Sequence, residues 1–159
     1  MNAMIGPEWL QLDLLMRLGL AVVLGAVVGI ERELTGKEAG LRTTILICLG
    51  AALFTELSTT LAGPGADNTR ITAQIVTGIG FLGAGAILRT DGQIRGLTTA
   101  ATIWVVAAIG IAAGGGEYVA AVGTTILVMI ILVPLRWWEH RVQAKIEVVE
   151  AERRYSARE

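Results

Sequence analysis

The chain has 159 residues, of which 53% are hydrophobic and 17% charged, and its mean hydropathy is strongly positive at +0.63. This composition excludes an ordinary water-soluble domain and indicates an integral membrane protein, for which no nucleic-acid partner is expected. The total net charge of −1 says little, and the positions of the charges say more.

Five apolar segments are long enough to cross, or nearly cross, a hydrocarbon core about 30 Å thick. They are residues 10–30, 43–62, 71–88, 97–113 and 118–135. No linker between them exceeds 12 residues, so consecutive helices should be antiparallel neighbours. We therefore predict an all-α, five-helix transmembrane domain over residues 1–135, followed by a short charged tail over residues 136–159.

The first span follows no basic segment and no signal-cleavage site, so it should remain as a transmembrane helix. It contains Asp13 and Arg17, which are four residues apart and therefore share one helix face. Gly25 and Gly29 form a Gly-x-x-x-Gly pair, which marks a face for close helix contact, within the chain or between chains.

The second span carries Cys48 and Glu56. Because Cys48 is the only cysteine and His140 the only histidine, one chain can form neither a disulfide nor a zinc site built from thiolates and imidazoles. No Ser, His and Asp set, Cys and His pair or phosphate-binding loop stands in a suitable context, so the sequence does not indicate an enzyme.

The third span has no charged residue between Ile71 and Ile87 and is rich in glycine. Its glycines are Gly78, Gly80, Gly83 and Gly85. The first three have the spacing of the dinucleotide-binding motif G-x-G-x-x-G. The strand that precedes this motif and the acidic residue that follows it are absent from the sequence. We interpret these glycines as helix-packing positions.

Lysine and arginine placement predicts the orientation, because short cytoplasmic loops retain these residues. All 13 except Arg17 and Arg70 fall in the first loop, the third loop or the tail. The N-terminus should therefore lie outside and the C-terminus in the cytoplasm.

The segment from Gly36 to Thr44 resembles the segment from Gly92 to Thr99 at a spacing of 56 residues. One interpretation is that spans one and two and spans three and four are parallel repeats. The other is convergence on glycine turns followed by threonine helix caps.

Several motifs follow one another in a fixed order along residues 18–116. They are GIERE at 29–33, AGLRT at 39–43, RI at 70–71, AQIV at 73–76, GIGFLGAG at 78–85, RGL at 95–97, TAAT at 99–102 and Trp104. This set resembles the MgtC/SapB family of bacterial membrane proteins. The resemblance implies a multi-pass inner-membrane protein associated with growth at low magnesium and with survival inside macrophages.

The same resemblance implies an action on other membrane proteins, including the F-type ATP synthase. The best-known relatives continue into a cytoplasmic ACT-like domain, and residues 136–159 are too few to form it. We expect membrane lipids as surroundings, a homo-oligomer with a dimer favoured, and other membrane proteins as partners.

Polar residues within or beside the spans are the candidate sites, because charge in the bilayer is costly. Toward the outside lie Asp13, Arg17, Glu56, Asp67, Arg70 and Gln74. The three carboxylates could supply oxygen ligands for Mg²⁺, the only cofactor we consider. Alternatively, the group is an internal ion-pair network, and Asp67 belongs to a turn or caps the third helix.

A second set of polar residues lies toward the cytoplasm and forms either a docking surface or ordinary topology-setting charges. It includes Glu31, Arg32, Arg42, Thr43 and Arg95. Two hypotheses for the function therefore remain. The first is a regulatory interaction protein whose small-residue faces bind other membrane proteins; the alternative is a transporter of Mg²⁺ or another cation that uses the outer carboxylates.

Overall fold

The computed structural model describes residues 8–61, 67, 69–90 and 93–134. The predicted tail, 136–159, lies outside the described residues. The chain divides into one compact unit that runs to Thr125 and a second that begins at Ile126. The contacts given below all belong to the first unit.

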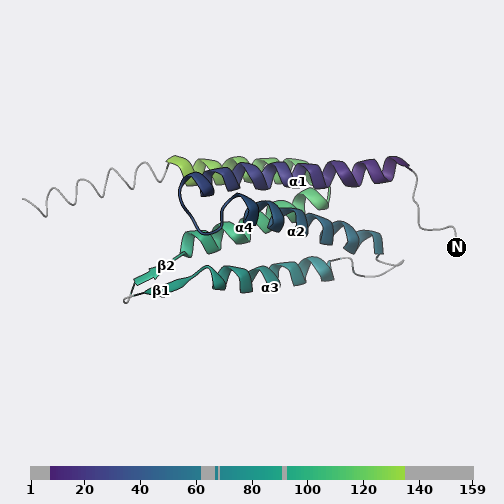
Figure 1. Ribbon diagram of the computed structural model, residues 1–159. Helices are drawn as coiled ribbons and strands as arrows, with labels where there is room; N and C mark the ends of the chain where they lie inside the picture. The colour runs from purple at the N-terminus through teal and green to yellow at the C-terminus, as the bar shows by residue number, and fades with distance from the viewer. Residues whose placement is uncertain (1–7, 62–66, 68, 91–92, 135–159) are drawn as a thin grey trace, which may run out of the picture. The chain divides into compact units, whose positions relative to one another are not determined.

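The five predicted helices are confirmed (Figure 1). They are α1 (Glu8–Leu34), α2 (Leu41–Leu61), α3 (Arg70–Gly85), α4 (Leu97–Gly114) and a fifth helix, Tyr118–Pro134. Within the described residues, α1, α2 and α4 are long and apolar enough to cross a membrane, whereas α3, with 16 residues, and the fifth helix are shorter. The chain is therefore a helical membrane protein.

The third helix ends at Gly85, earlier than predicted, because the chain then forms an antiparallel β-hairpin. Its strands are β1 (Leu88–Thr90) and β2 (Gln93–Arg95), with Leu88 opposite Arg95. From the sequence alone, this segment is expected to be a plain linker. The Asp-Gly dipeptide between the strands is typical of a two-residue hairpin turn, and it could have indicated the hairpin.

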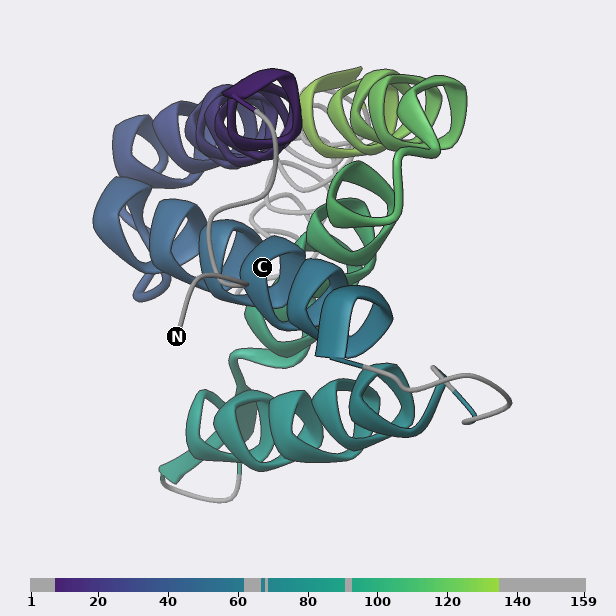
Figure 2. The same cartoon turned by 90° about the vertical axis from the view of Figure 1, so that its right-hand side faces the viewer.

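Helices α2 and α4 lie at the centre of the first unit, since each of them contacts the three other helices among α1–α4. Figure 1 shows that α1 and α3 run in one direction and that α2 and α4 run in the other. In the end-on view of Figure 2, the teal α3 lies at the margin of the helix group. It buries only Ile79 and Gly83 among the described residues.

Close packing of α2 depends on two Gly-x-x-x-Gly pairs on its neighbours. A Cβ added to Gly25 of α1 would lie 2.9 Å from the Cβ of Cys48, and one added to Gly114 of α4 would lie 2.8 Å from the Cα of Ala52. Gly29 and Gly110 are similarly crowded against α2. The glycines therefore let three backbones approach closely, as is common between membrane helices.

The glycines of α3 have different surroundings. Gly83 makes ordinary contact with Ala100 of α4, 3.7 Å from an added Cβ. An added Cβ at Gly78, Gly80 or Gly85 would meet no heavy atom of the described residues within 4 Å. The packing role predicted for these three glycines therefore has no counterpart inside the described part of this chain.

The two segments proposed as repeats start their second helices at equivalent positions. Helix α2 begins after Gly40 and α4 begins after Gly96. The preceding links differ, because Gly36 closes α1 in a left-handed conformation (φ 65°), whereas the hairpin precedes α4. The parallel repeat and the orientation of the termini stay predictions.

Candidate functional site

Arg17 of α1 is the centre of a polar network that joins several helices. Its Nη2 lies 2.7 Å from Oδ2 of Asp13, one turn earlier in α1. Its Nη1 donates to Oε2 of Glu56 in α2 at 3.2 Å and to the carbonyl oxygen of Gly114 in α4 at 3.0 Å. One guanidinium therefore connects three helices that are distant in the sequence.

The chemistry of each partner explains why Arg17 lies there. Gly114 is the last residue of α4, where carbonyl groups lack intrahelical partners and a cation is favoured by the helix dipole. Tyr118, at the start of the fifth helix, donates its hydroxyl to Oδ1 of Asp13 at 3.4 Å. Thr60 donates to Oε1 of Glu56 at 3.3 Å. Each oxygen of the Asp13 and Glu56 carboxylates therefore has a partner, either Arg17 or a hydroxyl group.

The network is partly shielded from the surroundings. The side chains of Arg17, Asp13 and Glu56 are 24%, 38% and 20% exposed. Nε of Arg17 is buried and has no hydrogen-bond partner among the described residues. The geometry is that of an ion-pair network with one more carboxylate than cation, the alternative to a metal site that the sequence left open.

Within the described residues, no hydrogen bond or ion pair joins the three remaining members of the predicted outer group to this network. Asp67 and Arg70 pair with each other at 3.7 Å, and both side chains are exposed. Asp67 also accepts hydrogen bonds from the backbone N–H and hydroxyl of Thr69, which lower its pKa below the ordinary value for an aspartate. Gln74 lies on α3. Within the described residues, no three acidic, histidine or cysteine side chains form a group that could hold a metal.

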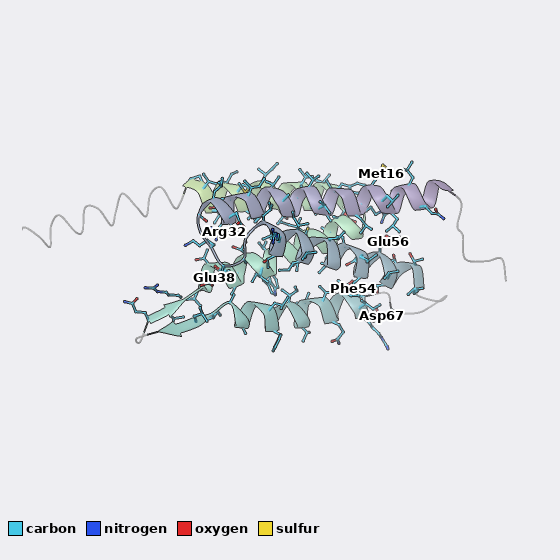
Figure 3. The ribbon with its side chains drawn as sticks, in the orientation of Figure 1. Met16, Arg32, Glu38, Phe54, Glu56 and Asp67 are labelled. Carbon is cyan, nitrogen blue, oxygen red and sulfur yellow. The ribbon has the colours of Figure 1, made fainter. Side chains whose placement is uncertain are left out.

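The residues predicted to face the cytoplasm lie at the opposite end of the helices, as the labels of Arg32 and Glu56 in Figure 3 show. Nε of Arg32 pairs with Oε2 of Glu31 at 2.7 Å, and both side chains are buried. Glu33 accepts the backbone N–H of Leu41 at 3.0 Å and so caps α2. The acid-rich end of α1 therefore holds the start of its neighbour.

Two polar residues predicted at this end are exposed on the first turn of α2: Arg42 and Thr43. Arg95 is also exposed and borders a pocket beside the start of α4. The structure thus separates the predicted cytoplasmic set into a buried ion pair, Glu31 and Arg32, and exposed residues on the first turn of α2 and at the end of β2.

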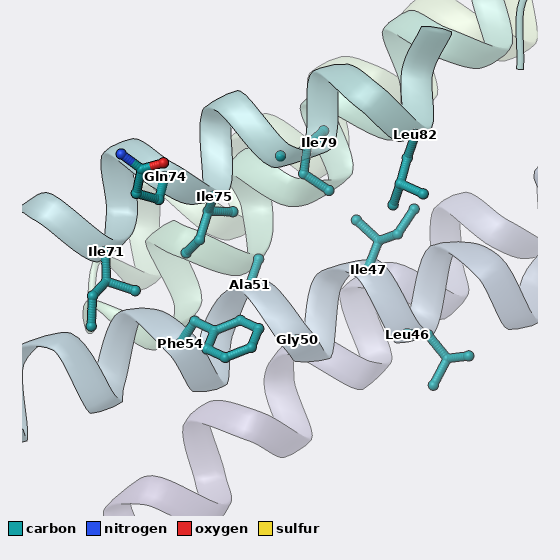
Figure 4. A pocket seen from close by; sticks show the side chains of 11 residues that line it. Leu46, Ile47, Gly50, Ala51, Phe54, Ile71, Gln74, Ile75, Ile79 and Leu82 are labelled. Carbon is teal, nitrogen blue, oxygen red and sulfur yellow. The ribbon is translucent and has the colours of Figure 1, made fainter. Parts of the chain in front are cut away.

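An apolar groove of about 520 Å³ lies between α2 and α3. Figure 4 shows Ile75 and Ile79 of α3 directed toward Ala51 and Ile47 of α2. Phe54 and Gln74 line the same groove. Because α3 is otherwise little buried, this side of the protein offers an apolar surface rather than a polar channel.

Sequence reasoning missed several residues of the Arg17 network. Tyr118 and Thr60 have no local pattern that ties them to Asp13 or Glu56, so only the fold brings them together. Gly110 and Gly114 did carry a signal, because they repeat the Gly-x-x-x-Gly spacing of Gly25 and Gly29.

Comparison with known proteins supports the family suggested by the motifs. The profile of the MgtC family matches residues 18–141, a stretch that begins directly after Arg17 and includes its partners Glu56 and Gly114. The chain belongs to the MgtC family. No solved structure gave a significant match.

Individual relatives agree with this family assignment. Protein MgtC of Salmonella paratyphi A is 44% identical over 137 residues, which cover 85% of this chain and 58% of that protein. YhiD of Escherichia coli strain K12, which is named as a candidate magnesium transporter, is 44% identical over 127 residues, 76% of this chain and 59% of that protein. A protein of Synechocystis, slr0014, is 46% identical over 122 residues, 77% of this chain and 52% of that protein. This chain therefore spans a little over half the length of these MgtC family relatives.

Proposed function

We propose that this protein is a bacterial inner-membrane component of adaptation to low magnesium and virulence-type stress, and that it acts by binding other membrane proteins. The F-type ATP synthase is the partner class that the family resemblance implies. The proposal applies to the membrane domain spanned by the chain.

The observation that carries this proposal is the unpartnered small-residue face of α3. Ala73, Thr77, Gly80 and Ala84 are exposed and spaced by four, three and four residues, so they form one stripe along the helix. Small residues let transmembrane helices approach closely. A helix of a partner protein could pack along this stripe without displacing any side chain of the described residues.

The proposal is tested by co-purification from bacterial inner membranes. Gly80→Leu fills the stripe, whereas Gly19→Leu places the same side chain on exposed α1, where an added Cβ also meets nothing within 4 Å. We expect the Gly80 variant to lose ATP synthase subunits and the Gly19 variant to retain them. Equal recovery by both variants, or recovery of this protein alone by the wild type, would contradict the proposal.

The second candidate function is transport of magnesium. The name of YhiD and the intramembrane carboxylates of Asp13 and Glu56 favour it. Against it, both carboxylates are already neutralised in part by Arg17, which would repel a divalent cation.

Magnesium flux into liposomes that contain the purified protein separates the two functions. The regulatory function predicts no flux above that of empty liposomes. Flux that disappears in Asp13→Asn or Glu56→Gln would instead establish transport.

A further inference from the structure

A polar pocket of about 510 Å³ lies between the α1–α2 loop and the start of α4. It is lined by Gly36, Lys37, Glu38, Ile94, Arg95, Gly96, Leu97, Thr98 and Thr99. Its volume is within the range of about 300–1,000 Å³ typical of small-molecule sites. The pocket is separate from the Arg17 network, which lies at the other end of the helices (Figure 3).

The start of α4 supplies backbone donors to this pocket. The first hydrogen bond of the helix runs from the N–H of Ala100 to the carbonyl oxygen of Gly96, at 2.8 Å. No acceptor among the described residues bonds the N–H groups of Leu97, Thr98 or Thr99, and the N-cap residue has no side chain. Such free N–H groups, together with the helix dipole, attract anions.

The geometry at Gly96 fixes these donors in place. Its backbone is left-handed, with φ 86°, and an added Cβ would collide with the carbonyl oxygen of Ala86. Only glycine adopts this conformation without strain. The start of α4 can therefore lie directly against the end of α3, at Ala86.

Thr99 provides an independent indication of a ligand. It is only 3% exposed and lines the pocket, and its hydroxyl has no hydrogen-bond partner among the described residues. The hydroxyl oxygen is not one of the fully enclosed side-chain atoms that lack a partner, so it is open to the pocket, where a bound group can reach it. The hydroxyl of Thr102, one turn later, instead donates to the carbonyl oxygen of Thr98 at 2.8 Å.

The start of α2 shows what the start of α4 lacks. There the carboxylate of Glu33 accepts the N–H of Leu41 and serves as an internal anion. The residue 56 positions after Glu33, in the register of the two similar segments, is Arg89, a cation. The position equivalent to Glu33 therefore holds no carboxylate, and an external anion could bond the first N–H groups of α4 instead.

The side-chain charges of the pocket also suit an anion. Lys37 and Arg95 line it together with the single carboxylate of Glu38, which leaves an excess of one positive charge. Figure 3 labels Glu38 near the hairpin end of the helices. Arginine and lysine beside a helix N-terminus are the usual partners of phosphate oxygens.

We propose that this pocket binds a phosphate group, either of a small phosphorylated solute or of a lipid headgroup. The phosphate oxygens accept hydrogen bonds from the first N–H groups of α4 and from the hydroxyl of Thr99. Lys37 and Arg95 neutralise the charge, and Glu38 limits the affinity.

Two binding measurements on the full chain distinguish the sources of the phosphate. Isothermal titration calorimetry with inorganic phosphate, in a maltoside detergent, tests the free solute. Native mass spectrometry with added phosphatidylglycerol tests the lipid headgroup. We expect saturable binding in at least one of these two arms.

Matched variants test the assignment of the pocket. Thr99→Val should weaken binding about tenfold, since it removes a hydrogen bond to a charged group. Arg95→Gln should weaken it at least about threefold, and Glu38→Gln should strengthen it by a similar factor, by Coulomb attraction and repulsion near the surface. The controls are Thr102→Val and Arg42→Gln, which remove a hydroxyl and a cation outside the pocket lining and should leave binding unchanged.

The gain expected for Glu38→Gln cannot arise from misfolding, so it keeps the test decisive if another variant is unstable. Absence of binding of both probes to the wild type would overturn the proposal. So would equal losses in Arg42→Gln and Arg95→Gln, because a general surface charge would then explain the binding.

Discussion

Replacing Arg17 by methionine is the sharpest test of the polar network. The substitution keeps a long apolar stem but removes the guanidinium that bonds Asp13, Glu56 and the carbonyl oxygen of Gly114. The two carboxylates then lose their shared cation while they remain partly shielded.

The magnitude follows from the exposure of the partners. Exposed ion pairs contribute about 0.2–1 kcal/mol each, whereas breaking a buried pair costs about 3–5 kcal/mol. The Arg17 network, with side chains 20–38% exposed, lies between these limits. We therefore expect Arg17→Met to reduce the free energy of unfolding by about 2–4 kcal/mol.

Single neutralisation should cost less. Glu56→Gln retains an amide oxygen that can accept from Arg17, and Asp13 still provides a charge, so we expect a loss of about 1 kcal/mol. The triple variant Arg17→Met, Asp13→Asn, Glu56→Gln should recover part of the loss of Arg17→Met, since it removes the unpaired carboxylates.

Equilibrium unfolding in mixed detergent micelles, titrated with sodium dodecyl sulfate, measures all of these variants on one scale. The reasoning fails if Arg17→Met unfolds within about 0.5 kcal/mol of the wild type, the usual range for surface substitutions. It also fails if the triple variant is no more stable than Arg17→Met. The unpaired carboxylates would then not be the cause of the lost stability.

Three further predictions concern local contacts. Gly110→Ala should lower stability by about 1–3 kcal/mol, because its Cβ would meet the backbone of α2, whereas Gly123→Ala has open space and should not destabilise; detergent unfolding compares them. Glu33→Ala should cost about 1 kcal/mol and increase hydrogen exchange at the first amides of α2, which it caps. Thr69→Val should raise the pKa of Asp67 toward its ordinary value in a carboxyl NMR titration. Because the folded pKa of Asp67 is lowered, its stabilising bonds operate above the pKa of the unfolded chain and are lost as the pH falls through the lowered value; an unchanged titration would refute their role.

Local spacing predicted some contacts and not others. The pair of Asp13 and Arg17 follows from a separation of four residues on one helix, and the Gly25 and Gly29 face follows from the same geometry. The outer group did not form as one cluster, because Asp67 bonds Thr69 in a local turn. A short polar side chain at a loop satisfies its nearest backbone donor before it reaches another helix.

The sequence by itself determined that the chain lies in lipid and where its five helices lie, but not the β1–β2 hairpin. Long apolar runs fix the helices and their approximate bounds, since a backbone in lipid must satisfy its own hydrogen bonds. The tertiary structure decided which of the outer polar residues meet Arg17, added Gly114 to them, and showed that the glycines of α4, rather than three of those in α3, pack inside the described part of the chain. The physical reason is that the register of one helix against another depends on close contacts of small residues across the whole interface, which no local spacing records.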